Sequence, residues 1–315
     1  MQEKEGRRLE ISRLLSKSYR LFESGVFDEA RRFLNEAHSL DFENTEVRSA
    51  LRACGFWKER ADGLSQLPGD GSRGDYLRRH WRVFDCTYRR RLEHPLNEGC
   101  NSLKTWVHTE ALGYYKRQAA VSNDPEALLQ AGRCHKTLGR FEECRSTLEA
   151  ALRLSDKSDA RLLAELADAY AAMGETRAAK VLMREALFLD AGSVDIGELA
   201  APLFLRLIER AEKETNAHSP GFPEWLPVYG ALWGVFDVKR ELSPVEYGKL
   251  KQKIYALKSE MADGDEQDLL RPKLINHYLR MIDHYQATGA DRSVMDEVLI
   301  EIKLLSPAVY RNYLE

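Results

Sequence analysis

The sequence predicts an all-α fold, and three observations support that prediction. Apolar residues recur with the helical period of about 3.6 residues through almost every segment. Helix starts are marked: Asp124 precedes Pro125, and Ser243 stands three residues before Glu246, as capping side chains do. Alternating β-branched runs bounded by turn residues are missing from the sequence.

Four glycines follow helical stretches and predict the turns of helical hairpins: Gly25, Gly139, Gly174 and Gly289. Glycine ends helices in this way because it adopts the left-handed conformation at little cost. Three of the units share an order of large, small, turn, aromatic, small, large, small and large residues. The order is Leu14, Ser18, Gly25, Phe27, Ala30, Leu34, Ala37, Leu40, then Leu128, Gly132, Gly139, Phe141, Cys144, Leu148, Ala151, Leu154, then Leu163, Ala167, Gly174, Thr176, Ala179, Met183, Ala186, Leu189.

This pattern resembles the tetratricopeptide repeat (TPR), a helix-turn-helix of about 34 residues that stacks into a superhelix. The resemblance covers roughly residues 11–44 and 125–192, although the early Trp and the late Pro of the family are missing and Thr176 replaces the aromatic residue. A weaker hairpin is expected near 272–306, where Glu301 breaks a small position. The resemblance implies an all-α α-solenoid of TPR-like helix-turn-helix repeats with divergent helical segments.

Four regions are expected along the chain. They are an N-terminal TPR-like hairpin (1–47), a divergent helical segment with a basic helix (48–124), two TPR repeats with a following helix (125–214) and a C-terminal helical, TPR-like region (224–315). A loop is expected at 67–74 before a helix near 74–92, and the prolines of 215–227 predict a chain break.

The resemblance implies a concave groove, lined by the first helices of consecutive hairpins, that binds an extended peptide or helix of a partner protein. Its positions fall on Leu15, Tyr19, Phe22, Leu129, Arg133, Lys136, Arg161, Glu165 and Asp168. Alternatively, these charges only solvate exposed faces. The chaperone-binding subclass clamps a terminal carboxylate with cations and amides, and Glu165 at such a place argues against that subclass.

A basic stretch offers a second interpretation. Residues 48–124 hold 14 basic and 9 acidic side chains, and arginines alternate there with Tyr76, Trp81 and Tyr88. The arginines of this patch are Arg78, Arg79, Arg82, Arg89, Arg90 and Arg91. Guanidinium groups beside aromatic rings suit phosphates and stacked bases, so a nucleic-acid-binding regulator acting through the 74–91 helix is the alternative. A contact with the acidic remainder of the chain, or a solvated helix face, would explain the same residues.

No catalytic, cofactor or metal motif stands out, so the chain is expected to be non-enzymatic and to need no cofactor. The G-x-G-x-x-G at residues 69–74 lacks the preceding strand of a dinucleotide site. Five metal-capable side chains are spaced by six or eight residues rather than the two to four typical of zinc sites, so no metal is expected. They are His80, Cys86, His94, Cys100 and His108.

The remaining features bear on partners and compartment. Trp225, Tyr229, Trp233 and Phe236 form a helical stripe that predicts core packing or, if exposed, self-association. Five cysteines exclude a complete internal disulfide framework, and the polar start predicts a cytoplasmic protein, exported only if a signal segment was trimmed away. We therefore expect a scaffold or adaptor for another protein. A helper subunit of a solute transporter, which some bacterial proteins with these repeats resemble, remains a third interpretation and would require export.

Overall fold

The structure is a computed structural model that describes residues 2–155, 158–264 and 267–314. Within these residues the chain forms fifteen α-helices and no strand, and helices that follow one another in the chain pack in pairs. The fold is therefore all-α and has the pairwise packing of an α-solenoid, as predicted. No helix among these residues has the length and apolar character needed to cross a membrane. The contacts divide the chain into unit 1 (Met1–Thr147) and unit 2 (Leu148–Glu315).

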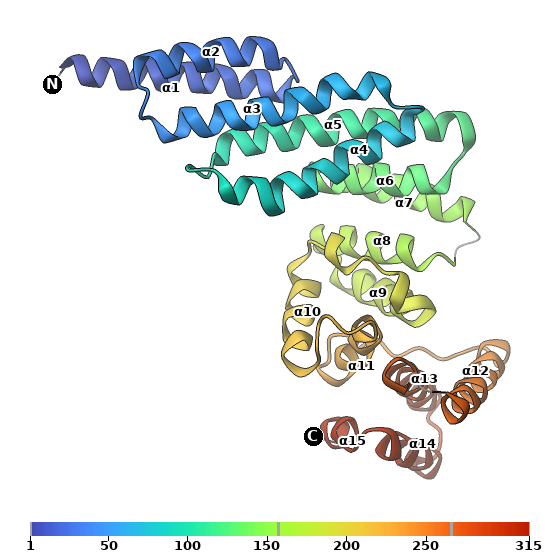
Figure 1. Cartoon of the computed structure of the whole chain (residues 1–315). Helices are drawn as coiled ribbons and strands as arrows, with labels where there is room; N and C mark the ends of the chain where they lie inside the picture. The colour runs from blue at the N-terminus through green and yellow to red at the C-terminus, as the bar shows by residue number, and fades with distance from the viewer. Residues whose placement is uncertain (1, 156–157, 265–266, 315) are drawn as a thin grey trace. The chain divides into compact units, whose positions relative to one another are not determined.

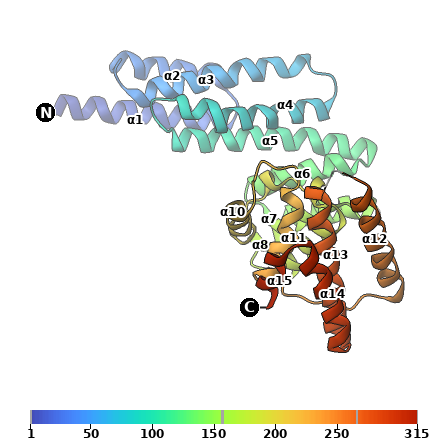
Figure 2. The ribbon, with the colours of Figure 1, turned by 60° about the horizontal axis from the view of Figure 1, so that its bottom comes forward.

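Unit 1 is built around one long central helix, α5. The helices are α1 (Gln2–Glu23), α2 (Phe27–Leu40), α3 (Thr45–Gly63), α4 (Asp70–Val83), α5 (Asn97–Ser122), α6 (Pro125–Thr137) and the first part of α7 (Phe141–Leu154). Helix α2 packs against α1 and α3, whereas α5 packs against α1, α4 and α6 (Figure 1). In the rotated view α5 again runs along α1 and α4 (Figure 2). Residues distant in sequence thereby share one core.

The core of unit 1 is aromatic at its centre. Trp57 on α3 is fully buried, and its ring lies 5.5 Å from that of Phe84 and 5.7 Å from that of Trp106, between ring centroids. Trp81 also stacks on Trp57, at 6.1 Å. Large rings bury 150–250 Å² each, so this cluster supplies much of the hydrophobic stabilisation of the unit.

Two glycines of the G-x-G-x-x-G motif, Gly71 and Gly74, lie inside helix α4, so the prediction of a loop was wrong for residues 70–74. Helix α4 begins at Asp70, directly after Gly69, whose φ is +72°. A Cβ atom on Gly71 would lie 2.0 Å from Oε1 of Gln118, and one on Gly74 would lie 2.6 Å from the ring of Tyr115. The missing side chains thus let α4 approach α5 closely. The regular α-helix then ends at Val83 and continues as a π-helical turn (Phe84–Tyr88) and a 3₁₀ turn (Arg89–Arg91).

The four predicted hairpin turns all form around a left-handed glycine. The φ angles are +72° at Gly25, +73° at Gly139, +85° at Gly174 and +66° at Gly289. In each turn the amide of the residue after the glycine donates a hydrogen bond of 2.9 Å to a carbonyl oxygen five residues back. This is the Schellman motif, which satisfies carbonyl groups that the helix end leaves without partners.

The small positions of the three units are buried, which confirms their predicted packing role. Exposure is zero at Ser18, Ala30, Ala37, Cys144, Ala151, Ala167, Ala179 and Ala186. Cys144 therefore occupies the place of a small packing residue. A buried thiol behaves as a small apolar group, so this cysteine needs no chemical role.

Unit 2 contains the C-terminal part of α7 and eight further helices. They are α8 (Ala160–Ala172), α9 (Thr176–Asp190), α10 (Pro202–Glu214), α11 (Phe222–Leu232), α12 (Pro244–Asp263), α13 (Gln267–Thr288), α14 (Arg292–Leu305) and α15 (Pro307–Leu314). Helix α13 packs against α11, α12 and α14, and α8 pairs with α9. The hairpin expected near 272–306 is formed by α13 and α14.

The proline-rich segment breaks the chain, as predicted, but only over residues 215–221. Pro223 lies in the first turn of α11, and Pro227 lies inside that helix. The helix ends at Leu232, so the aromatic stripe is not one continuous helical face. The rings of Tyr229 and Trp233 stack at 4.8 Å, and Phe236 is buried against Gly230. The stripe therefore belongs mainly to the packing of unit 2.

Helix α13 carries a buried histidine. His277 is 8% exposed, and its Nδ1 donates a hydrogen bond to the carbonyl oxygen of Lys273 at 2.8 Å. Its ring lies 4.9 Å from that of Phe188 on α9. Burial, which penalises the charged imidazolium, together with the nearby charges of Lys253 and Lys273, lowers the pKa of His277 from 6.5 to about 4.

The buried histidine should make unit 2 less stable in mild acid. The unfolded chain takes up a proton on His277 below pH 6.5, whereas the folded chain does so only near pH 4. Stability from this group is complete above pH 6.5 and is lost as the pH falls toward 4. We expect a loss of about 2 kcal/mol between pH 7.5 and 5. Urea unfolding at both pH values measures it. His277→Phe, which cannot titrate, should reduce the loss, and an equal loss in that variant would contradict the assignment.

Candidate partner-binding site

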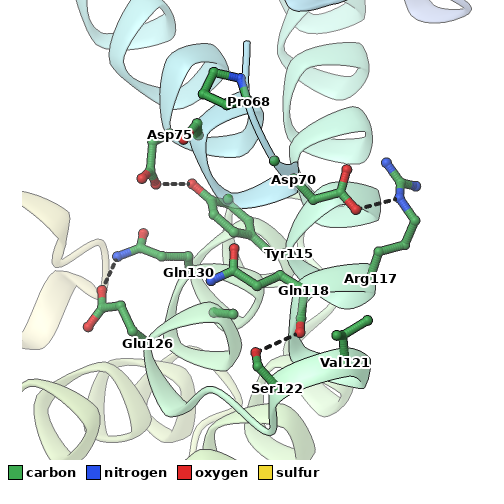
Figure 3. A pocket seen from close by; sticks show the side chains of 14 residues that line it. Pro68, Asp70, Asp75, Tyr115, Arg117, Gln118, Val121, Ser122, Glu126 and Gln130 are labelled. Carbon is green, nitrogen blue, oxygen red and sulfur yellow. Dashed lines mark hydrogen bonds and ion pairs between the residues drawn. The ribbon is translucent and has the colours of Figure 1, made fainter.

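A cavity of about 680 Å³ opens within unit 1, where the start of α4, the end of α5 and the start of α6 meet. Figure 3 shows its side chains converging from the three helices. The close approach of α4 to α5 at Gly71 and Gly74 places this opening beside the first turns of α6. Helix α6 itself is fixed at its start by Asp124, whose carboxylate accepts a hydrogen bond from the amide of Glu126 at 2.9 Å.

The lining is polar, with three carboxylates and one guanidinium group. The carboxylates belong to Asp70, Asp75 and Glu126, and the guanidinium group belongs to Arg117. Arg117 Nε donates to a carboxylate oxygen of Asp70 at 3.1 Å (Figure 3). The cavity therefore presents more acidic than basic lining residues, and it favours a group that carries positive charge or several hydrogen-bond donors.

Neutral donors hold two of these carboxylates in place. The Tyr115 hydroxyl donates to Asp75 at 2.7 Å, and the Gln130 amide donates to Glu126 at 2.7 Å (Figure 3). Burial of Tyr115 and its hydrogen bond to Asp75 raise the pKa of the tyrosine, so it stays a phenol that donates. Asp75 and Glu126 are themselves exposed. An arrangement of fixed, accessible carboxylates can orient an incoming cation without first reordering the site.

The first three predicted groove residues are core residues. Leu15, Tyr19 and Phe22 are 5%, 2% and 0% exposed. Tyr19 packs against Gly99 of α5, where a Cβ would lie 2.7 Å from its ring, and its hydroxyl donates to Glu46 at 2.9 Å. Helix α5 covers this face of α1. A groove at these residues would need a second TPR hairpin beside the first, but α5 packs there instead.

The other groove positions are also buried, except Arg161. Leu129, Arg133 and Lys136 of α6 and Glu165 and Asp168 of α8 are all less than 9% exposed. Arg161 is half-buried, and its guanidinium group pairs with Asp159 at 2.9 Å.

Asp168 has a structural role in unit 2. Its carboxylate accepts the amide hydrogens of Ala200 and Ala201, at 2.9 and 2.8 Å, and so ties the start of α10 to α8. A carboxylate bound to backbone amides in this way stabilises the fold and is not available to a partner.

The basic stretch does not present free aromatic rings. Trp81 stacks on Trp57, and Tyr88 lies 4.6 Å from Phe56, so both rings take part in the core of unit 1. Arg89 is held by Asp85 at 3.2 Å. The other arginines differ in their settings. Arg78 donates to Gln130, whereas Arg79, Arg82, Arg90 and Arg91 are exposed. Tyr76, the third ring expected to stack on bases, lies 4.1 Å from the ring of His80, so all three rings already have a ring neighbour.

The metal-capable side chains of the same stretch are not gathered into a metal site. Among the residues that the structure describes, no group of three or more His, Cys, Asp or Glu side chains is arranged to hold a metal ion. Cys100 is buried and its pKa is raised by burial, which keeps the thiol protonated. His108 is buried in the core beside Trp81, at 5.8 Å between ring centroids.

Helix α6, one of the three helices that line the cavity, lies in a segment that matches a known protein family. Residues 125–158 match the tetratricopeptide repeat family. The chain contains a tetratricopeptide repeat. No curated protein matches the chain. The tetratricopeptide repeat begins at Pro125, so its first turn lies at the edge of the cavity through Glu126 and Gln130. A repeat of this family indicates protein–protein interaction.

The sequence patterns do not predict the residues that line the cavity. Asp124, beside the cavity residue Glu126, marks only a helix start in the sequence, and the glycines of α4 resemble only a nucleotide-binding motif. Asp75, Tyr115 and Gln118 meet at the cavity only because α4 packs along α5. Glycines on one helix that face large side chains on another would indicate a close helix–helix contact. That pattern can be recognised only once the two contacting helices are known.

Proposed function

We propose that this chain is a non-enzymatic scaffold or adaptor that binds a segment of a partner protein, and that the unit 1 cavity receives a lysine or arginine side chain of that segment. The tetratricopeptide repeat supports the interaction role. The observation on which the site rests is that the first turn of this repeat lines an open, carboxylate-rich cavity. No reaction is proposed, and tetratricopeptide repeats are generally non-catalytic.

The chemistry of the cavity supports a basic partner residue. Carboxylates of Asp75 and Glu126 are exposed and already oriented by neutral hydrogen-bond donors. A charged hydrogen bond contributes about 1.5–3 kcal/mol where the geometry is good. Surface charges also steer association and select against acidic partners. A few such charged hydrogen bonds would make the site specific for a basic partner segment, but they would not by themselves give tight binding.

The test is capture of partners from native lysate by the full chain, with and without nuclease, followed by mass spectrometry. The variant Asp75→Asn with Glu126→Gln removes both charges but keeps the shapes and the hydrogen-bond acceptors. The control is Glu36→Gln, which removes one exposed charge from α2, away from the cavity lining.

We expect one dominant protein that survives nuclease, is retained by Glu36→Gln and is reduced about tenfold by the double variant. Equal capture by all three proteins would remove the cavity from the proposal. Loss of all captured material after nuclease would instead favour the nucleic-acid alternative and its exposed arginines.

A further inference from the structure

A second cavity, of about 320 Å³, lies entirely within unit 2. The end of α9, the segment before α12, and α12 and α13 form its walls. Phe188, Leu242 and Leu250 provide an apolar surface, and the last two are buried. The volume is at the lower end of the range of about 300–1,000 Å³ found for small-molecule sites. It accommodates one aromatic or branched aliphatic group.

The acidic residues that line this cavity are already neutralised by arginines. Glu185 accepts a hydrogen bond from Arg280 at 2.7 Å. Glu246 pairs with Arg240 and also accepts the amide hydrogen of Ser243 at 2.9 Å, as part of the capping box of α12. Neither carboxylate is left to balance another cation.

Two lysines on α12 supply the remaining charge. Lys249 and Lys253 are four residues apart, on one face of the helix, and both line the cavity. In the described part of the chain neither ammonium group has an ion-pair partner. Like charges at this spacing repel each other. An anion bound between them would relieve that repulsion, whereas a neutral ligand would not.

Two buried polar side chains complete the inner wall. His277 and Arg280 are 8% and 6% exposed. Nδ1 of His277 donates to the carbonyl oxygen of Lys273, whereas Nε of Arg280 is buried with no hydrogen-bond partner among the described residues. A buried polar atom without a partner is unfavourable unless a ligand or water satisfies it.

We propose that this cavity binds a carboxylate joined to an apolar group about the size of a phenylalanine side chain. The apolar group packs on Phe188, Leu242 and Leu250, and the carboxylate lies between Lys249 and Lys253. Two sources share this chemistry: a small free acid and the C-terminal residue of a polypeptide. The proposal does not depend on the unit 1 cavity.

The experiment is calorimetric titration of the full chain with 3-phenylpropionate, with its neutral amide as a matched ligand. A second arm uses an N-acetylated peptide of three alanines and a C-terminal phenylalanine. The variant Lys249→Glu with Lys253→Glu reverses the proposed anion contacts. Lys251→Glu is the control, because this exposed lysine of the same helix lines a different cavity. Circular dichroism checks that helix content is equal in all proteins.

We expect the acid to bind, the amide to bind at least tenfold more weakly, and the double variant to lose tenfold or more in affinity while Lys251→Glu keeps it. Binding of the free acid alone identifies a small molecule as the source, and tighter binding of the peptide identifies a polypeptide terminus. Failure of both acids to bind at millimolar concentration, or equal binding of the amide, would overturn the proposal.

Discussion

Replacing Trp57 by alanine is expected to lower the free energy of unfolding of unit 1 by about 3–5 kcal/mol. The side chain is fully buried and touches rings from three parts of the unit, including Trp81, Phe84 and Trp106. Alanine would leave a cavity that the surrounding rings cannot fill without leaving their rotamers. Hydrogen exchange of α3, α4 and α5, measured peptide by peptide, reports the opening free energy directly.

Trp57→Phe provides the matched comparison. Phenylalanine keeps an aromatic ring in the cluster, and it removes Nε1, which is buried without a hydrogen-bond partner among the described residues. Removing this unsatisfied donor also removes its desolvation penalty, which offsets part of the stability lost through the smaller ring. We expect a loss of about 1 kcal/mol or less. Equal losses of unfolding free energy in the alanine and phenylalanine variants would show that the indole does not stabilise unit 1 by filling space in the core.

Gly25→Ala should destabilise unit 1 by about 3 kcal/mol, well above the effect of the same change at Gly139. Both glycines have nearly the same left-handed φ, +72° and +73°, so the conformational cost of about 1 kcal/mol is shared. Only at Gly25 does the new Cβ meet another side chain, Trp106 Nε1 at 2.3 Å. Trp106 is held by Phe27, at 4.8 Å between ring centroids, and cannot move aside freely.

The difference between the two glycine variants is the quantity to measure. Urea unfolding curves of Gly25→Ala and Gly139→Ala, compared at equal slope, isolate the clash from the cost of the left-handed turn. A larger exchange rate for the amides of α1 and α2 in Gly25→Ala would locate the effect. Equal midpoints for the two variants would show that Trp106 has room to shift.

Local signals in the sequence were sufficient to predict the helices and the hairpins. The turn glycines, the cap at Asp124 and the capping box at Ser243 act within a few residues, so their consequences can be read without knowing the fold. The buried small positions followed for the same reason, since two helices of one hairpin must pass each other closely.

The site residues were not predictable, because they depend on which distant helices touch. Leu15 and Phe22 have the spacing expected of a groove, yet α5, some eighty residues later in the chain, covers them. Asp168 has the charge of a groove residue, but it binds the amides of a later helix. Gly71 and Gly74 resemble a loop motif until Gln118 and Tyr115 are placed against them. Sequence periodicity predicts which face of a helix is apolar, but it does not predict which other helix packs against that face.

The bond from Asp168 to Ala200 and Ala201 has a consequence for the order of folding. It closes a loop of 32 and 33 residues that contains all of α9. We therefore expect the start of α10 to gain its anchor after α8 and α9 have paired, because their pairing brings the ends of this loop together and lowers the entropy cost of closing it. Opening of the α8–α9 hairpin would in turn release α10, so the smallest cooperative segment in this part of unit 2 is three helices long rather than two.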